Sequence, residues 1–201
     1  MLLSDIEIKE AMKKGEIEIS GHPDIYIGPS SLDLHLDNKA MILDDTKVKL
    51  SEPIHYKEHS FQGLSFEDKE KSASMFSEYN GWDKIVIYPG EFYILSSVEK
   101  IKFADDIAGF IQGRSSIARM GINIHAAGYF DVGFEGTATL EVTNFTKFPI
   151  IIPKDTRICQ MVFARTGKKA EVPYNKKKDS KYQGQSGPTI TSIHKDYHEK
   201  S

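Results

Sequence analysis

The chain from Lys84 onward is divided into short apolar runs by turn-forming residues, and this division limits the fold more than any other feature of the sequence. Pro-Gly, Asp-Asp, single glycines and Asn-Phe-Thr-Lys separate the runs. The runs read KIVIY, FYILSSVEKIKF, IAGFIQG, INIHAAGYF, ATLEVTNF, FPIIIP and RICQMVFAR. Many short strands with almost no helical periodicity are typical of an all-β barrel or sandwich. We therefore expect a mainly β fold without a repeat of fixed period.

The N-terminal part predicts one short helix, one strand and one long polar connection. Ser4 precedes Glu7 at the spacing of a capping box, which indicates a helix over residues 4–14. In SLDLHLD the leucines alternate with polar residues, as they do in a half-buried strand. Residues 55–83 are polar and weakly periodic, and they indicate a loop or insertion with one helical turn.

Residues 172–201 differ in composition from the rest of the chain, because they lose the apolar periodicity and are rich in Lys, Gln, Gly and Ser. Such a segment is either an arm that orders only against something else or a disordered end. The length of 201 residues allows one sizeable domain or two small ones. We expect one domain over residues 1–201, with 172–201 as its C-terminal arm.

Composition and charge exclude several classes of protein. The net charge of −3 argues against a surface that binds nucleic acid, so any phosphate binding must be focal. No run approaches the ~20 apolar residues that span a membrane, and the start of the chain lacks the uninterrupted apolar core of a signal peptide. Cys159 is the only cysteine, which excludes an intramolecular disulfide and favours a reducing compartment. We therefore expect a cytoplasmic protein.

A first group of candidate functional residues follows Gly113 directly. Hydrogen-bond donors are concentrated there in the side chains of Arg114, Ser115, Ser116 and Arg119. Guanidinium groups and hydroxyls suit phosphate oxygens, because they form charge-assisted hydrogen bonds in a fixed geometry. The spacing also fits a helix N-terminus whose serines cap the helix and whose arginines face solvent, and the sequence leaves both interpretations open.

A second group lies around the glycine-rich turn DVGFEG, which begins with Asp131 and leads into the run TATLEV. Strand alternation places Thr139 and Glu141 on the face opposite Leu140 and Val142. Glu141 is then either an ordinary solvent-facing residue or directed into a polar pocket. A sequestered carboxyl has a raised pKa, and general acid–base catalysis requires such a group.

Other chemistries lack their sequence signals. The histidines show no metal-ligand spacing, and H-x-E with a following P-C-x-x-C is absent, so a zinc nucleobase-deaminase site is not expected. Cys159 lies among apolar residues in RICQMVF, which favours a core thiol over a nucleophile. Neither a Walker loop nor a dinucleotide-binding G-x-G-x-x-G occurs.

Four motifs in order, GRSSIARMGI, AGYFDVGFEGTATLE, RICQMVF and KYQGQSGPT, resemble those of the dCTP deaminases of the trimeric dUTPase superfamily, including their bifunctional dUMP-forming branch. The likeness runs from the N-terminal helix to about Asp196. It implies a distorted β-barrel of the β-clip type that assembles as a homotrimer, with active sites at subunit boundaries and the C-terminal arm closing over the nucleotide. It also implies that Mg²⁺ accompanies the triphosphate, without zinc or any metal held by protein side chains.

The resemblance assigns roles to individual residues. Glu141 matches the general base, which takes a proton from the water that attacks C4 of cytosine, and Asp131 matches the carboxylate under the deoxyribose 3′-hydroxyl. Ser115 and Arg119 complete the implied catalytic set. Arg114, Ser115, Ser116 and Arg119 match the residues that bind the triphosphate and the catalytic water. The backbone of Thr139 and Leu140 matches the contacts to the base or sugar. The other phosphate-binding matches are Gln160, Tyr174, Lys181 and Gln185.

Two features within the resemblance favour a bifunctional enzyme that converts dCTP to dUMP with release of ammonia and pyrophosphate. Glu141 matches deaminases, whereas plain dUTPases place an apolar residue there. The loop INIHAAGYF is one residue shorter than the common deaminase pattern and resembles the Ala-Gly hairpin of dUTPases. The alternatives are a dUTP diphosphatase in which Glu141 is structural, and a regulatory trimer that binds dCTP or dUTP without turnover. Inhibition by dTTP is left open.

Overall fold

The structure is a computed structural model that describes residues 1–44, 68–125 and 127–198. The strands of these residues are β1 (Ile17–Ser20), β2 (Tyr26–Gly28), β3 (Ser31–Leu43), β4 (Phe76–Asn80), β5 (Lys84–Ile87), β6 (Phe92–Phe103), β7 (Ile107–Gly113), β8 (Ile122–His125), β9 (Tyr129–Phe130), β10 (Glu135–Asn144), β11 (Ile150–Pro153) and β12 (Arg157–Arg165). The helices are α1 (Asp5–Lys13), α2 (Lys69–Ser74), α3 (Ser115–Ala118), the 3₁₀ turn η2 (Tyr174–Lys176) and α4 (Lys195–His198).

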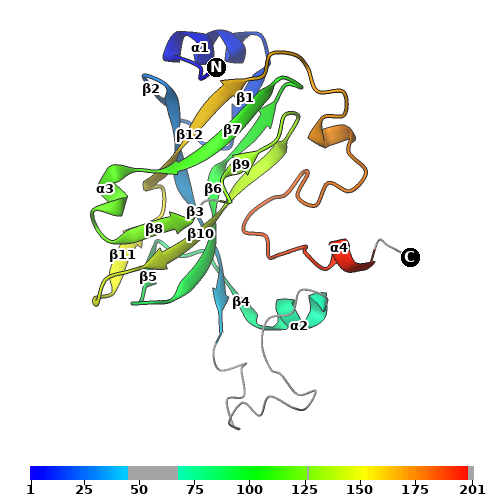
Figure 1. Cartoon of the computed structure of the whole chain (residues 1–201). Coiled ribbons are helices and arrows are strands. Elements are labelled where there is room, and N and C mark those ends of the chain that lie inside the picture. The colour runs from blue at the N-terminus through cyan, green and yellow to red at the C-terminus, as the bar shows by residue number, and fades with distance from the viewer. Residues whose placement is uncertain (45–67, 126, 199–201) are drawn as a thin grey trace.

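Ten of these strands form one antiparallel sheet with the order β8-β10-β6-β3-β12-β7-β9, while β1 also pairs with β6, and β2 and β4 pair with β3. A flat path of seven strands, spaced by about 4.8 Å, would separate its two edges by roughly 29 Å. The edge strands β8 and β9 are joined by the four steps from His125 to Tyr129, which span at most about 14 Å. The sheet must therefore curl into a distorted barrel (Figure 1).

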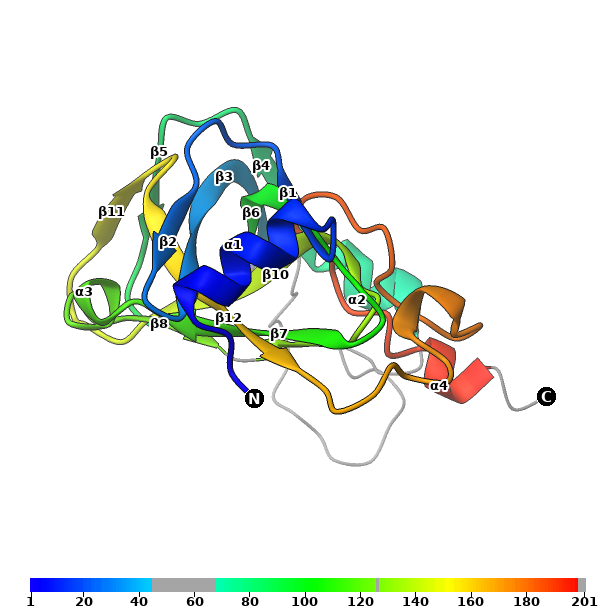
Figure 2. The ribbon, with the colours of Figure 1, turned by 90° about the horizontal axis from the view of Figure 1, so that it is seen from above.

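The core lies inside this curled sheet. Leu32, Leu34 and Leu36 of β3 are almost completely buried, as the alternation in SLDLHLD predicts. Leu140 and Val142 of β10 bury their side chains in the same core. One end of the barrel is covered by α1, which lies across the strands when the molecule is seen from above (Figure 2). The separate pair β5–β11 extends from the opposite part of the barrel.

The predicted N-terminal helix is confirmed, with its capping box. The Ser4 hydroxyl accepts a hydrogen bond from the Glu7 backbone N–H at 3.4 Å, and the Glu7 carboxylate accepts one from the Ser4 N–H at 2.8 Å. Two N–H groups that a helix start leaves without intrahelical partners are satisfied in this way. The helix buries Ile8 and Ala11 against the barrel end.

The predicted mainly β fold is confirmed, and each apolar run after Lys84 contains a strand. The run INIHAAGYF contains two, β8 and β9. Within 55–83 the expected helical turn corresponds to α2, whereas β4 was not expected as a strand there. Residues 55–67 of that stretch lie outside the described residues. None of the described helices is long and apolar enough to cross a membrane.

The described part of the C-terminal arm is ordered against the barrel of its own chain, so the alternative of a disordered end is wrong for these residues. Its backbone runs beside the start of β10, where Gly184 N–H donates to Glu135 O at 2.7 Å and Thr137 N–H donates to Gln185 O at 3.0 Å. The Thr137 hydroxyl accepts a hydrogen bond from Gly187 N–H at 2.9 Å. In Figure 1 the arm, coloured orange to red, follows one side of the barrel down to α4.

Substitution Thr137→Val should loosen the arm without changing the shape of β10. Valine keeps the branched side chain but leaves Gly187 N–H without its acceptor, which costs about 1–3 kcal/mol for a buried donor. Hydrogen exchange of the arm peptide over residues 180–192 should therefore become roughly tenfold faster. Thr143→Val, farther along the same strand, is the control. Unchanged exchange in the Thr137 variant would show that this hydroxyl does not hold the arm.

Candidate functional site

The first cavity, which we call the strand–arm cavity, has a volume of about 540 Å³ and lies between β10, β9 and the C-terminal arm. Its lining contains five of the residues that the sequence singled out, namely Asp131, Thr139, Glu141, Tyr174 and Gln185. Much of the remaining wall is aromatic, with side chains from β4, β6, β9 and the arm. A cavity of this size with an apolar wall and a few convergent polar groups is typical of a small-molecule site.

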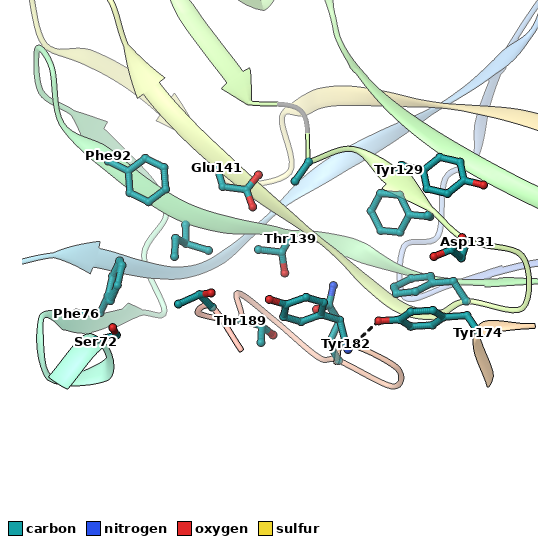
Figure 3. A pocket seen from close by; sticks show the side chains of 16 residues that line it. Ser72, Phe76, Phe92, Tyr129, Asp131, Thr139, Glu141, Tyr174, Tyr182 and Thr189 are labelled. Carbon is teal, nitrogen blue, oxygen red and sulfur yellow. Dashed lines mark hydrogen bonds between the residues drawn. The ribbon is translucent and has the colours of Figure 1, made fainter. Parts of the chain in front are cut away.

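Strand alternation in β10 places Thr139 and Glu141 in this cavity. Leu140 is only 1% exposed and points into the core, while Thr139 and Glu141 are half-buried on the opposite face. The pairing of β10 with β6 shifts register between Thr137 and Thr139, and such a bulge re-aims the side chains that follow it. Figure 3 shows the Glu141 carboxylate directed into the cavity beside Thr139. The solvent-facing interpretation of Glu141 is therefore wrong for this chain.

Asp131 and Tyr174 lie at the opposite end of the cavity from Glu141 (Figure 3). Asp131 follows β9 directly and accepts a backbone hydrogen bond from Phe134 N–H at 3.1 Å, across a turn in which Gly133 takes a φ of +78°. Tyr174 is fixed twice, because its N–H donates to Val132 O at 2.9 Å and its hydroxyl accepts from the Tyr182 N–H at 3.0 Å. The turn thus fixes the backbone of Asp131, and the arm fixes the Tyr174 side chain.

The second cavity, which we call the arginine cavity, has a volume of about 620 Å³ and lies at the start of α3. It gathers Arg114, Ser115, Ser116 and Gln160 from the predicted set. No side chain caps α3 at its N-cap residue Arg114, whose guanidinium lies 3.4 Å from the Asp33 carboxylate. The alternative of a helix start with capping serines and solvent-facing arginines is therefore correct for the helix and for the exposed Arg119, and wrong for the serine cap and for Arg114.

The sequence analysis missed two charged residues of the arginine cavity, Asp33 and Arg157. Asp33 Oδ2 lies 3.3 Å from a guanidinium nitrogen of Arg157 as well as 3.4 Å from Arg114 Nε, and it fixes both cations. Arg157 also stacks on the Tyr26 ring at 4.4 Å, which rigidifies it further. Arg157 begins the motif RICQMVFAR and Asp33 lies in SLDLHLD, but no local pattern relates residues so far apart in the sequence.

The Ser31 hydroxyl orients Gln160 in the arginine cavity, because it donates a hydrogen bond to the Gln160 side-chain oxygen at 3.4 Å. The amide nitrogen of Gln160 then remains as the group that can donate toward the cavity. Together with two guanidiniums and the hydroxyls of α3, this makes the cavity rich in donors, although Asp33 offsets part of the charge. Such a set suits an anion that carries several oxygens.

The remaining predicted residues lie outside both cavities. Arg119 is exposed at the C-terminal end of α3, and the Leu140 side chain is in the core. Lys181, in the arm, forms an ion pair with Asp196, and its hydrogen bond to that carboxylate raises the pKa of the lysine, which remains a cation. The two cavities have no lining residue in common, so a single chain divides the predicted residues into two groups.

A cluster that the sequence spacing did not indicate contains His22, His35 and Glu99, which offer one ligand atom each within 4.8 Å of one another. The two imidazole rings stack at 3.7 Å with an angle of 6° between their planes. A metal ion must lie close to the plane of each imidazole that binds it, and two parallel stacked rings do not meet this condition. The Glu99 carboxylate instead accepts a hydrogen bond from the backbone N–H of His35 at 2.9 Å, and its other oxygen lies 2.5 Å from Nδ1 of the His35 ring. These two contacts satisfy the buried carboxylate.

Comparison with known proteins identifies the family of the chain. The dCTP deaminase-like family model matches residues 2–166, and the chain belongs to this family. A relative from Dictyoglomus thermophilum is named dCTP deaminase, dUMP-forming. It is 34% identical over an alignment of 207 positions, which covers 100% of this chain and 98% of the relative. A second with that name, from Methanosphaera stadtmanae, is 36% identical over 200 residues, covering 98% of this chain and 95% of the relative. The resemblance inferred from the four motifs is thereby confirmed.

A solved structure supports the fold independently. The 2′-deoxycytidine 5′-triphosphate deaminase from Agrobacterium tumefaciens superposes with a TM-score of 0.59 at 20% identity, covering 82% of this chain and 48% of that chain. Similarity at this level of identity establishes the arrangement of strands.

Cys159 should not react with a thiol reagent in the native protein. Its side chain is completely buried in β12, and burial raises the pKa of the thiol far above its ordinary value, so the reactive thiolate is suppressed. At mildly alkaline pH, dithiobis(nitrobenzoate) should label no thiol of the folded chain and its one thiol after denaturation in guanidinium. Rapid labelling of the folded protein would contradict the assignment of Cys159 to the core.

Proposed function

We propose that this protein deaminates dCTP hydrolytically at C4 of cytosine and cleaves the triphosphate to give dUMP, ammonia and pyrophosphate. The observation that carries the proposal is the Glu141 carboxylate directed into the strand–arm cavity. Full-length relatives named dCTP deaminase, dUMP-forming, support it. We further propose that residues 1–201 act as one domain, with 172–201 as its arm, and that the enzyme is cytoplasmic.

In the proposed deamination, the nucleoside occupies the strand–arm cavity with its sugar toward Asp131 and its base toward Glu141. Glu141 takes a proton from water as the oxygen bonds to C4, and it passes this proton to the ring. It then moves the second proton, from the new C4 hydroxyl, to the amino group as the C4–N bond breaks. Ammonia leaves and uracil remains. The backbone of Thr139 and Leu140 borders the base or sugar, and Asp131 accepts a hydrogen bond from the 3′-hydroxyl.

In the proposed hydrolysis, a second water attacks the α-phosphorus of the resulting dUTP, and pyrophosphate leaves. Asp131 helps to orient this water. The triphosphate lies in a donor-rich site made from the arginine cavity, with Ser115 and Arg119 as its catalytic members and Arg114, Ser116, Gln160, Tyr174, Lys181 and Gln185 as further contacts. A Mg²⁺ ion bound to the triphosphate would neutralise part of its charge, and we expect no protein side chain to be its ligand. We also propose dTTP as an inhibitor, since it carries the same sugar and triphosphate.

The separation of the two cavities supports a homotrimer with shared active sites. The strand–arm cavity holds the carboxylates and the arginine cavity holds the phosphate-binding donors, and no residue lines both. A nucleotide needs both groups at once. We therefore propose that the arginine cavity of one subunit faces the strand–arm cavity of its neighbour, and that the arm of residues 172–201 closes over the nucleotide.

Substitution Glu141→Gln should abolish deamination of dCTP while dUTP hydrolysis survives. Glutamine keeps the shape but cannot take a proton, so the rate of ammonia release from dCTP should fall by about 10²–10⁴-fold. Glu135→Gln is the control, since that carboxylate lies on the same strand but pairs with Lys100 outside the cavity. Incubation with dCTP and with dUTP, followed by identification of dUTP, dUMP and ammonia, measures both steps. Undiminished ammonia release would refute the role of Glu141.

A mixture of two inactive variants tests the shared site. Glu141→Gln and Arg114→Ala subunits should each fail alone to release ammonia from dCTP, whereas co-expression should restore this deamination at about a quarter of the sites of a random trimer. Each restored site takes its glutamate from one subunit and its arginine from the other. Size-exclusion chromatography with light scattering checks the trimer. If mixed trimers form and remain inactive, the site is not divided in this way.

A further inference from the structure

The hydroxyl of Thr139 is buried in the strand–arm cavity and has no hydrogen-bond partner among the described residues. Such a group loses its hydrogen bonds to water on folding and gains none in the protein. The full desolvation penalty therefore lowers the free energy of unfolding. The neighbouring Thr137, two residues earlier on the same strand, shows the usual situation, because its hydroxyl accepts a hydrogen bond from Gly187 N–H at 2.9 Å. The lone hydroxyl of Thr139 therefore needs an explanation.

A structural explanation does not suffice. A β-branched side chain suits a strand, but valine has the same shape and would fill the same space without an unsatisfied oxygen. The hydroxyl also lies where a ligand is expected, between Asp131 at one end of the cavity and Glu141 at the other (Figure 3). Thr139 and Glu141 occupy the same face of β10, two residues apart. A polar atom in this position is suited to a bound molecule.

We propose that the Thr139 hydroxyl binds the N3 edge of the pyrimidine ring and recognises both cytosine and uracil. This inference rests on the proposed function and adds a specificity-determining side chain to it. N3 of cytosine accepts a hydrogen bond, whereas N3 of uracil carries a hydrogen and donates one. A hydroxyl can do either, since its O–H rotates and its oxygen has free lone pairs. One side chain can thus hold the ring before and after deamination.

The inference also connects the base to closure of the arm. Tyr182 and Thr189 of the arm lie beside Thr139 in the cavity (Figure 3). With the arm in the position seen here, the Thr139 hydroxyl is buried and no group of the described residues is its hydrogen-bond partner. When the arm closes over a nucleotide, the base supplies that partner. Nucleotide binding therefore favours the closed arm by the hydrogen bond that the empty state lacks.

The variants Thr139→Val and Thr139→Ser test the proposal, with Thr143→Val as a matched control on the same face of β10 outside the cavity. The valine variant should lower kcat/KM for dCTP and for dUTP by about tenfold or more, and the serine variant should retain most of both activities. Inhibition by inorganic triphosphate should be unchanged, which locates the effect at the nucleoside. In the absence of nucleotide, the valine variant should unfold about 2–4 °C higher, because the unsatisfied hydroxyl is gone.

Each outcome is decisive. Loss of activity together with higher stability supports a ligand-binding hydroxyl, while loss of both activity and stability indicates a structural threonine and overturns the inference. Unchanged kinetics for both substrates overturn it as well. A defect with dCTP alone contradicts recognition of uracil N3–H. Failure of the wild-type protein to convert dCTP or dUTP would instead refute the proposed function, and so the two failures are distinguishable.

Discussion

β10 is hydrogen-bonded along both edges, to β6 and to β8, and this double pairing determines which face of the sheet each of its side chains occupies. Leu140 and Val142 complete the core, so Thr139 and Glu141 must lie on the other face. A slip of one residue would exchange the two faces and place the carboxylate among apolar side chains, where an unpaired charge is very costly. The energy that buries the leucine therefore also positions the acid.

The arm depends on the same strand. Its hydrogen bonds to the backbone of Glu135 and Thr137 set its register against β10. Gly136 lies between them with a φ of +155°, and a Cβ at that position would meet the Gln185 carbonyl oxygen at 3.0 Å. The glycine thus permits the close approach of the two backbones. Strand and arm form the two walls of one cavity, and a change in the first displaces the second.

Local features were predictable from the sequence, and distant contacts were not. The capping box at Ser4 and the alternation around Glu141 depend on residues a few positions apart, and both occur as expected. Asp33 and Arg157 are separated by 124 residues, and their ion pair exists only because β3 and β12 are neighbours in the curled sheet. The arm docks on β10, and β4 forms by pairing with β3. Composition does not identify either partner strand. The motif resemblance singled out residues that line both cavities and implied active sites at subunit boundaries, but it did not show which residues line which cavity.

That division has a physical advantage for the proposed chemistry. A guanidinium beside a carboxylate stabilises its charged form, which would weaken Glu141 as a proton acceptor. Asp33 holds Arg114 and Arg157 together in the arginine cavity, apart from the strand–arm cavity of the same chain. In the proposed trimer, the arginine cavity of one subunit would face the strand–arm cavity of the next, with the cations at the phosphates and the acid at the base. The length of the bound nucleotide would then keep the arginines at the phosphates away from the Glu141 carboxylate at the base.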